Sequence, residues 1–98
     1  MSKCDLEDFC RAQPLDKTEI LAYLKPDLGN CLYLFLDIDT YEIGAGVIDV
    51  WIQRAIDSTI IGIAMRYMDS FQLYARQENI DKVNYADLAN IIRNLLRS

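Results

Sequence analysis

The chain has 98 residues, of which 52% are hydrophobic, so it is long enough for one domain with its own core. We treat residues 1–98 as a single domain. Fifteen acidic and ten basic residues give a net charge of −5, and ten of the acidic residues lie in the first fifty positions. The acidic first half argues against binding of a phosphate backbone, which needs clustered Lys and Arg, so no nucleic-acid partner is expected.

The composition also excludes several kinds of active site. The sequence contains no histidine, which rules out Ser-His-Asp catalysis, Cys-His catalysis and histidine-bound metals. Cys4, Cys10 and Cys31 do not have the spacing of metal ligands. We therefore expect no metal, no cofactor and no catalytic residue, and we lean toward a chain that is not an enzyme.

The sequence gives no sign of a membrane segment. It has no run of about 18 apolar residues, which predicts no transmembrane helix and no membrane partner. The first residues, MSKCDLEDFC, are charged at once and lack the hydrophobic stretch of a signal peptide. We expect a cytoplasmic protein.

The first part of the chain predicts helices. Ser2 is a suitable cap for a short helix that ends at Pro14. Asp16 begins a second helix, which must stop near Lys25 because a proline follows. Residues 30–41 leave two alternatives open. They fit a buried strand by their aromatic and apolar density, and they equally fit a helix with one apolar face.

The middle of the chain predicts strands. The segments VIDVWIQ, TIIGIAMRY and FQLYA are rich in β-branched and aromatic residues, and short polar breaks separate them. They predict a three-stranded antiparallel β-meander over about residues 47–75. A single long helix over residues 42–76 is the alternative.

The end of the chain predicts a closing helix over residues 84–97. Asn84 is a suitable cap, and Leu88, Ile92 and Leu95 recur at helical spacing, so they should be buried against one face of the sheet. The predicted fold class is α+β, with N-terminal helices, the meander and this C-terminal helix.

Four aromatic residues in the predicted strands are candidates for a binding face. Aromatic residues on strands mostly pack in the core or form cross-strand pairs. A three-stranded sheet nevertheless has two edges, and one helix covers only part of a face. We therefore name as candidate partner-binding residues, for a protein partner or a homodimer, Trp51, Tyr67, Phe71 and Tyr74.

Two segments resemble the N-terminal part of bacterial acetyltransferases of the GNAT superfamily. The first is LKPDLGNCLYLFLDIDTYEIG followed by VWIQ, and the second is MRYMDSFQLYA. The resemblance covers about residues 15–98, and it implies helices, a small meander and a further helix. It also favours the helical alternative for residues 30–41. In complete members an acetyl-CoA-binding half follows, whose Gln/Arg-x-x-Gly-x-Gly/Ala loop has no match here.

Three functional hypotheses follow. The leading one is a non-catalytic accessory or recognition domain that acts through self-association or a protein partner. The first alternative, from the resemblance, is one half of a split acetyltransferase that needs a separate acetyl-CoA-binding chain. The second alternative, from the charge, is a small acidic inhibitor or adaptor protein.

Overall fold

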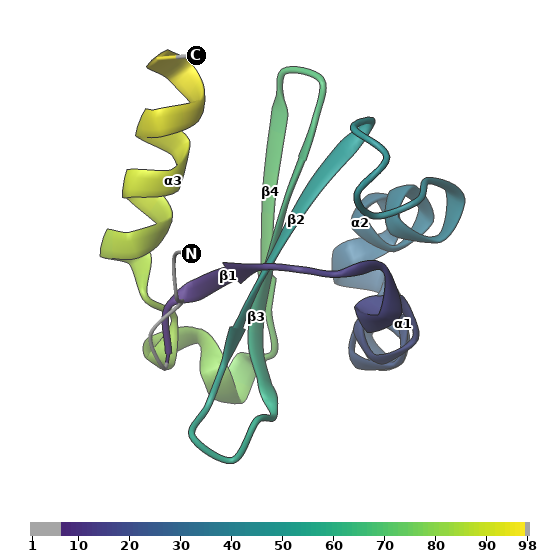
Figure 1. Cartoon of the computed structure of the whole chain (residues 1–98). Helices are drawn as coiled ribbons and strands as arrows, with labels where there is room; N and C mark the ends of the chain where they lie inside the picture. Colours follow the sequence, from purple (N-terminus) through teal and green to yellow (C-terminus); the bar gives the residue numbers. More distant parts are fainter. Residues whose placement is uncertain (1–6, 98) are drawn as a thin grey trace.

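The computed structural model describes residues 7–97, which form a four-stranded antiparallel sheet with helices on both faces (Figure 1). In order across the sheet, the strands are β1 (Phe9–Arg11), β2 (Ile48–Arg54), β3 (Ile60–Tyr67) and β4 (Ser70–Ala75). One face is covered by α1 (Lys17–Leu24) and α2 (Leu28–Thr40), and part of the other by α3 (Tyr85–Arg97). The connections include three 3-10 helices, η1 (Pro14–Asp16), η2 (Lys25–Asp27) and η3 (Gln77–Lys82).

The fold class is α+β as predicted, but two details of the prediction were wrong. Within residues 7–97 the sheet has four strands instead of three, because β1 pairs antiparallel with β2. The predicted helix over residues 2–14 is absent from its described part, and the part before residue 7 lies outside the described residues. The physical reason lies in distant contacts: β1 pairs with β2, and the buried ring of Phe9 packs beside Gly62 of β3, where a Cβ would stand 3.7 Å from its Cζ.

Helix α2 resolves the two alternatives for residues 30–41 in favour of a helix. Its buried side chains, Cys31, Leu34 and Ile38, recur at helical spacing and pack in the core against the sheet. The strand alternative would have placed successive side chains on opposite faces, and half of them would then have faced solvent.

The predicted strands and the closing helix are confirmed. The three segments of the meander form β2, β3 and β4, so the long helix over residues 42–76 is wrong. Gly44 and Gly46 turn the chain from α2 into β2, and their φ angles of 94° and 95° lie in the region that favours glycine. In α3, Leu88 is buried and Leu95 is half-buried against the sheet.

Two cores lie on opposite faces of the sheet. The larger one joins α1 and α2 to the sheet and contains fully buried side chains such as Ile20 and Ile63. The smaller one lies beneath α3, where Trp51 and Ala64 meet Leu88. Because both faces are partly covered, the edges of the sheet become the main places where backbone remains accessible.

The hydroxyl of Tyr23 continues the pairing of β3 and β4 beyond their last backbone partners. It donates to the carbonyl of Ile61 (2.7 Å) and accepts a hydrogen bond from the backbone N–H of Arg76 (3.0 Å). The N–H of Arg76 therefore points inward, toward β3. Because these directions alternate along a strand, the backbone groups that point outward from β4 belong to Phe71, Leu73 and Ala75.

A buried glutamine attaches the start of α3 to the sheet. Gln53 of β2 donates through Nε2 to the carbonyl of Lys82 (2.9 Å) and accepts through Oε1 from the N–H of Asn84 (2.8 Å). Asn84 caps α3 as predicted, since its Oδ1 accepts from the N–H of Asp87 (3.0 Å). These bonds satisfy polar groups that would otherwise be costly to bury.

Candidate partner-binding surface

Two of the four candidate aromatic residues lie on the face that α3 partly covers. The rings of Trp51 and Phe71 are 5.8 Å apart and tilted by 32°. Trp51 is buried, and the guanidinium of Arg11 lies 5.2 Å from the centre of its ring. Phe71 is only half-buried. Of this pair, Phe71 is therefore the residue that a partner can reach.

The other two candidates lie on the face of α1 and α2. Tyr74 is buried, and its hydroxyl donates to Oδ2 of Asp27 (2.6 Å). Burial, together with this hydrogen bond, raises the pKa of Tyr74 above its usual range. Tyr67 is half-buried and stacks on Tyr41, with ring centres 5.4 Å apart. The structure thus divides the four residues between two faces and does not bring them together as one patch.

The edge of the sheet formed by β1 is short and partly capped by the start of α3. This strand has three residues, and the N–H of Phe9 donates to Oδ2 of Asp87 at the start of α3 (2.7 Å). Beside it, Nδ2 of Asn84 donates to Oδ1 of Asp8 (3.0 Å). A short strand covered by a helix end is one of the ways in which proteins prevent an edge from pairing. This edge therefore offers less accessible backbone for docking than β4 does.

The opposite edge, formed by β4, is open. The outward N–H and C=O groups of Phe71, Leu73 and Ala75 have no hydrogen-bond partner within residues 7–97. The strand reads SFQLYA, which contains neither a charged residue nor a proline. Charges, prolines and bulges are the features that usually protect an exposed edge. β4 therefore presents accessible backbone without such protection.

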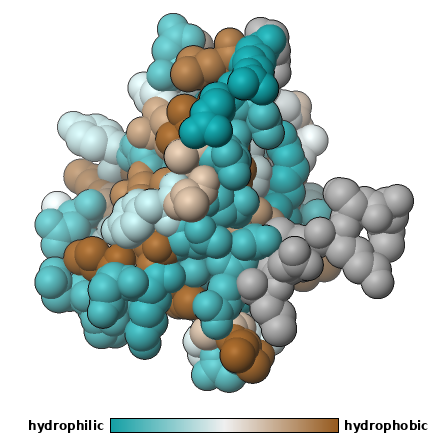
Figure 2. All heavy atoms as spheres, turned by 90° about the vertical axis from the view of Figure 1, so that its left-hand side faces the viewer, coloured by the Kyte–Doolittle hydropathy of each residue, from teal (hydrophilic) through white to brown (hydrophobic). Residues whose placement is uncertain are grey.

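A groove extends from β4 to the last turns of α3. It has a volume of about 430 Å³. Met68, the first residue of the β3–β4 turn, is exposed at its rim and has a φ of 52°, which costs a non-glycine residue about 1–2 kcal/mol. Figure 2 views the molecule from the side on which α3 lies, and it shows hydrophobic groups in separate patches among hydrophilic ones. The groove is lined by Arg66, Met68, Asp69, Ser70, Phe71, Ile92, Leu95 and Leu96.

A second hollow flanks the other half of β4. It has a volume of about 580 Å³ and is bordered by Asp27 and Asn30 on one side and by Ile80 and Tyr85 on the other. Ile80 and Tyr85 are exposed, and Leu73 of β4 lines the same hollow. Apolar side chains thus accompany the open backbone groups along the whole strand, which is the arrangement that strand addition requires.

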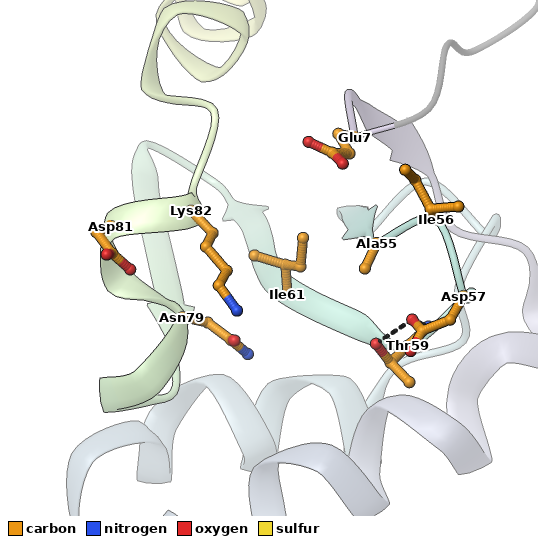
Figure 3. Close-up of a pocket in the computed structure, with 9 residues that line it drawn as sticks. All are labelled: Glu7, Ala55, Ile56, Asp57, Thr59, Ile61, Asn79, Asp81 and Lys82. Carbon is orange, nitrogen blue, oxygen red and sulfur yellow. Dashed lines mark hydrogen bonds between the residues drawn. The ribbon is translucent and has the colours of Figure 1, made fainter.

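A third hollow, of about 780 Å³, is polar (Figure 3). Lys82 and Asn79 of η3 line one side of it, and Asp57 and Thr59 of the β2–β3 turn line the other side. The hydroxyl of Thr59 (2.7 Å) and its N–H (3.1 Å) both donate to Oδ1 of Asp57, and these bonds hold the pKa of Asp57 below its usual value. This is the local bonding of a turn, so we assign no catalytic role to the pair.

The described residues contain no metal site and no activated cysteine. Between residues 7 and 97, no group of three or more Cys, Asp or Glu side chains is placed to hold a metal ion. Burial raises the pKa of the Cys31 thiol, which is the opposite of what activates a cysteine nucleophile. No helix in this part of the chain is long and apolar enough to cross a membrane.

The sequence analysis missed residues of the β4 surface. Leu73 was placed in a strand, but nothing indicated that the strand lies at an edge. Met68 and Leu96 were not singled out, because a turn and a helix end are ordinary places for exposed residues. The absence of charge from the last strand of a meander is the signal that would have drawn attention to Leu73.

Comparisons with models of protein families, with curated proteins and with solved structures found no match to this chain. The resemblance to the GNAT acetyltransferases therefore stays a prediction.

Proposed function

We propose that the chain is a non-catalytic recognition domain that associates with a second copy of itself through the β4 edge. The observation that carries this proposal is the row of outward backbone groups on Phe71, Leu73 and Ala75, which are unpartnered within residues 7–97. An uncharged, unprotected strand of this kind is a ready template for pairing with another chain.

The edge suits a second copy because it is self-complementary. Two β4 strands related by a twofold axis through Leu73 run antiparallel, with Leu73 opposite Leu73 and Phe71 opposite Ala75. Each pair then joins side chains on the same face, and a large ring meets a small methyl group. No like charges meet directly across the pair, since residues 70–75 carry none.

Light scattering at protein concentrations of about 1–100 µM tests this proposal. Interfaces of modest size dissociate in this range. The wild-type mass should rise from monomer toward dimer. Leu73→Lys brings two charges together at the axis and should stay monomeric. Ile56→Lys changes an isoleucine that is 74% exposed in the β2–β3 turn, so it is the matched control and should associate like the wild type.

Hydrogen exchange locates the contact. The amides of Leu73 and Ala75 point outward, so they should exchange fast in dilute protein and slowly in concentrated protein. The inward amides of Gln72 and Tyr74 should be protected under both conditions. A constant monomer mass contradicts self-association and leaves a strand of another protein as the occupant of the edge. A dimer that survives Leu73→Lys places the contact elsewhere and overturns the proposal.

A further inference from the structure

The outer face of α2 carries an apolar stripe that does not pack against the sheet. Leu32, Tyr33 and Leu36 are 47%, 74% and 45% exposed. Leu32 and Leu36 are four positions apart and Tyr33 and Leu36 are three, so the three side chains form one row on the part of α2 that follows the kink at Cys31, whose φ of −144° and ψ of 30° are not helical.

A helix that covers a sheet normally has an apolar inner face and a polar outer face. The inner face of α2 is buried through Cys31, Leu34 and Ile38. Its outer face departs from the pattern, because three large apolar side chains are exposed there alongside the exposed polar residues Asn30, Asp39 and Thr40. Single exposed apolar residues are ordinary, whereas a continuous row of large ones marks a contact surface.

The surroundings of this stripe are mainly acidic. Asp37 and Asp39 lie in the second half of α2, Asp27 precedes the helix, and Glu42 lies just beyond its end with its Oε1 3.9 Å from Nζ of Lys17. Lys25 is the cation nearest to the helix in sequence. Two copies of the stripe would bring the same acidic groups together, and like charges across an interface oppose binding. A partner that flanks its own apolar row with Lys or Arg would be attracted instead.

We propose that the α2 stripe binds an amphipathic helix of another protein, one whose apolar face is flanked by Lys or Arg. Leu32, Tyr33 and Leu36 supply anchors at helical spacing, and the ring of Tyr33 is the most exposed of them. This contact does not use β4, so it is independent of the proposed dimer.

Two designed helical peptides test the proposal. Both carry leucine at positions i, i+3, i+4 and i+7, and they differ only in having Lys or Glu beside this row. In fluorescence anisotropy titrations, the lysine peptide should bind and its affinity should fall with added salt. The glutamate peptide should bind at least about tenfold more weakly.

Substitutions locate the site. Leu36→Lys should weaken binding of the lysine peptide at least about tenfold, because it removes an anchor and adds a like charge. Its thermal midpoint should stay that of the wild type, since Leu36 is exposed. Ile56→Lys is again the matched control and should bind the peptide like the wild type.

Three outcomes would overturn the proposal. They are equal binding of the two peptides, no binding of either up to about 1 mM, and unchanged binding by Leu36→Lys. Light scattering of Leu36→Lys should show the same self-association as the wild type. A failure of the α2 proposal is thereby distinguished from a failure of the dimer.

Discussion

Tyr23 makes several contacts that hold β3, β4 and η3 together. Besides bridging Ile61 and Arg76, its hydroxyl accepts a hydrogen bond from Nδ2 of Asn79 (3.3 Å). Its ring lies 4.3 Å from the guanidinium carbon of Arg76 and meets the ring of Tyr74 edge-on, at 5.8 Å. Since the hydroxyl is buried between two backbone groups, those groups lose their partner if it is removed.

Tyr23→Phe should therefore lower the free energy of unfolding by about 1–3 kcal/mol, the cost of leaving buried polar groups unpaired. Urea denaturation measures this loss. Tyr33→Phe is the matched control, because Tyr33 is exposed and should change stability by less than about 0.5 kcal/mol. If the two substitutions lowered stability equally, the hydrogen bonds of the Tyr23 hydroxyl would contribute nothing to the free energy of unfolding.

Residue patterns alone did not reveal this role of Tyr23. Its position in α1 was predictable from the helix that begins near Asp16. Its bonds to Ile61 and Arg76 depend on how α1 lies across β3 and β4, and the chain segments involved are separated by 38 and 53 positions. Local patterns extend over a few residues, so they carry no information about such contacts.

At the scale of elements, the burial of the apolar stripe of α3 decreases from the start of the helix to its end. Leu88 is buried, Ile92 and Leu95 are half-buried, and Leu96 is 81% exposed. The predicted stripe thus exists, but it packs most tightly at the start of the helix, where Gln53 and Asn84 hold it to the sheet. Toward its end the helix leaves the groove beside Phe71 accessible.

Leu88→Ala should cost about 2–5 kcal/mol of stability, as do other truncations of buried leucine. Leu96→Ala, in the same helix, should be nearly neutral because its side chain is already exposed. Thermal or urea unfolding of the two variants makes the comparison. A loss below about 0.5 kcal/mol for Leu88→Ala would show that α3 is not packed on the sheet in solution.

At the scale of the whole molecule, Asp49 joins three strands. Its carboxylate accepts hydrogen bonds from Arg11 of β1 (2.8 Å) and Arg66 of β3 (2.6 Å). Burial raises the pKa of Asp49, but the two arginines outweigh this effect and hold that pKa below its usual value. Arg54 likewise lowers the pKa of Glu19 by donating a hydrogen bond that joins β2 to α1.

These lowered pKa values predict how stability depends on pH. A carboxylate whose pKa is lower in the folded state stabilises the fold above its unfolded pKa, about 4, and loses this contribution as the pH falls through the folded value. The chain has no histidine, so no imidazole titrates between about pH 5 and 8. The free energy of unfolding should therefore be nearly constant in that range and should fall below about pH 4.

Urea denaturation at a series of pH values measures this dependence. Asp49→Asn should be less stable at neutral pH, and its stability should fall less steeply in acid, because the titrating group is gone. A wild-type protein whose stability rises on acidification below pH 4 would contradict the sign of the prediction.

The sequence by itself determined the elements with a strong local pattern. The second helix, the three strands of the meander and α3 follow from caps, prolines and the period of apolar residues, which are properties of short segments. For residues 30–41 the same patterns supported both helix and strand. The packing of Cys31, Leu34 and Ile38 on the sheet decided between them.

Only the tertiary structure decided where the surfaces lie. β1 has three residues and becomes a strand because it pairs with β2 and the ring of Phe9 is buried against the sheet. Trp51 and Tyr74 were equal candidates with Phe71 and Tyr67 in the sequence, but neighbouring elements bury the first two. Whether a residue is in the core, at an edge or on an open helix face depends on which elements lie beside it. That arrangement comes from contacts between distant parts of the chain, which local periodicity does not record.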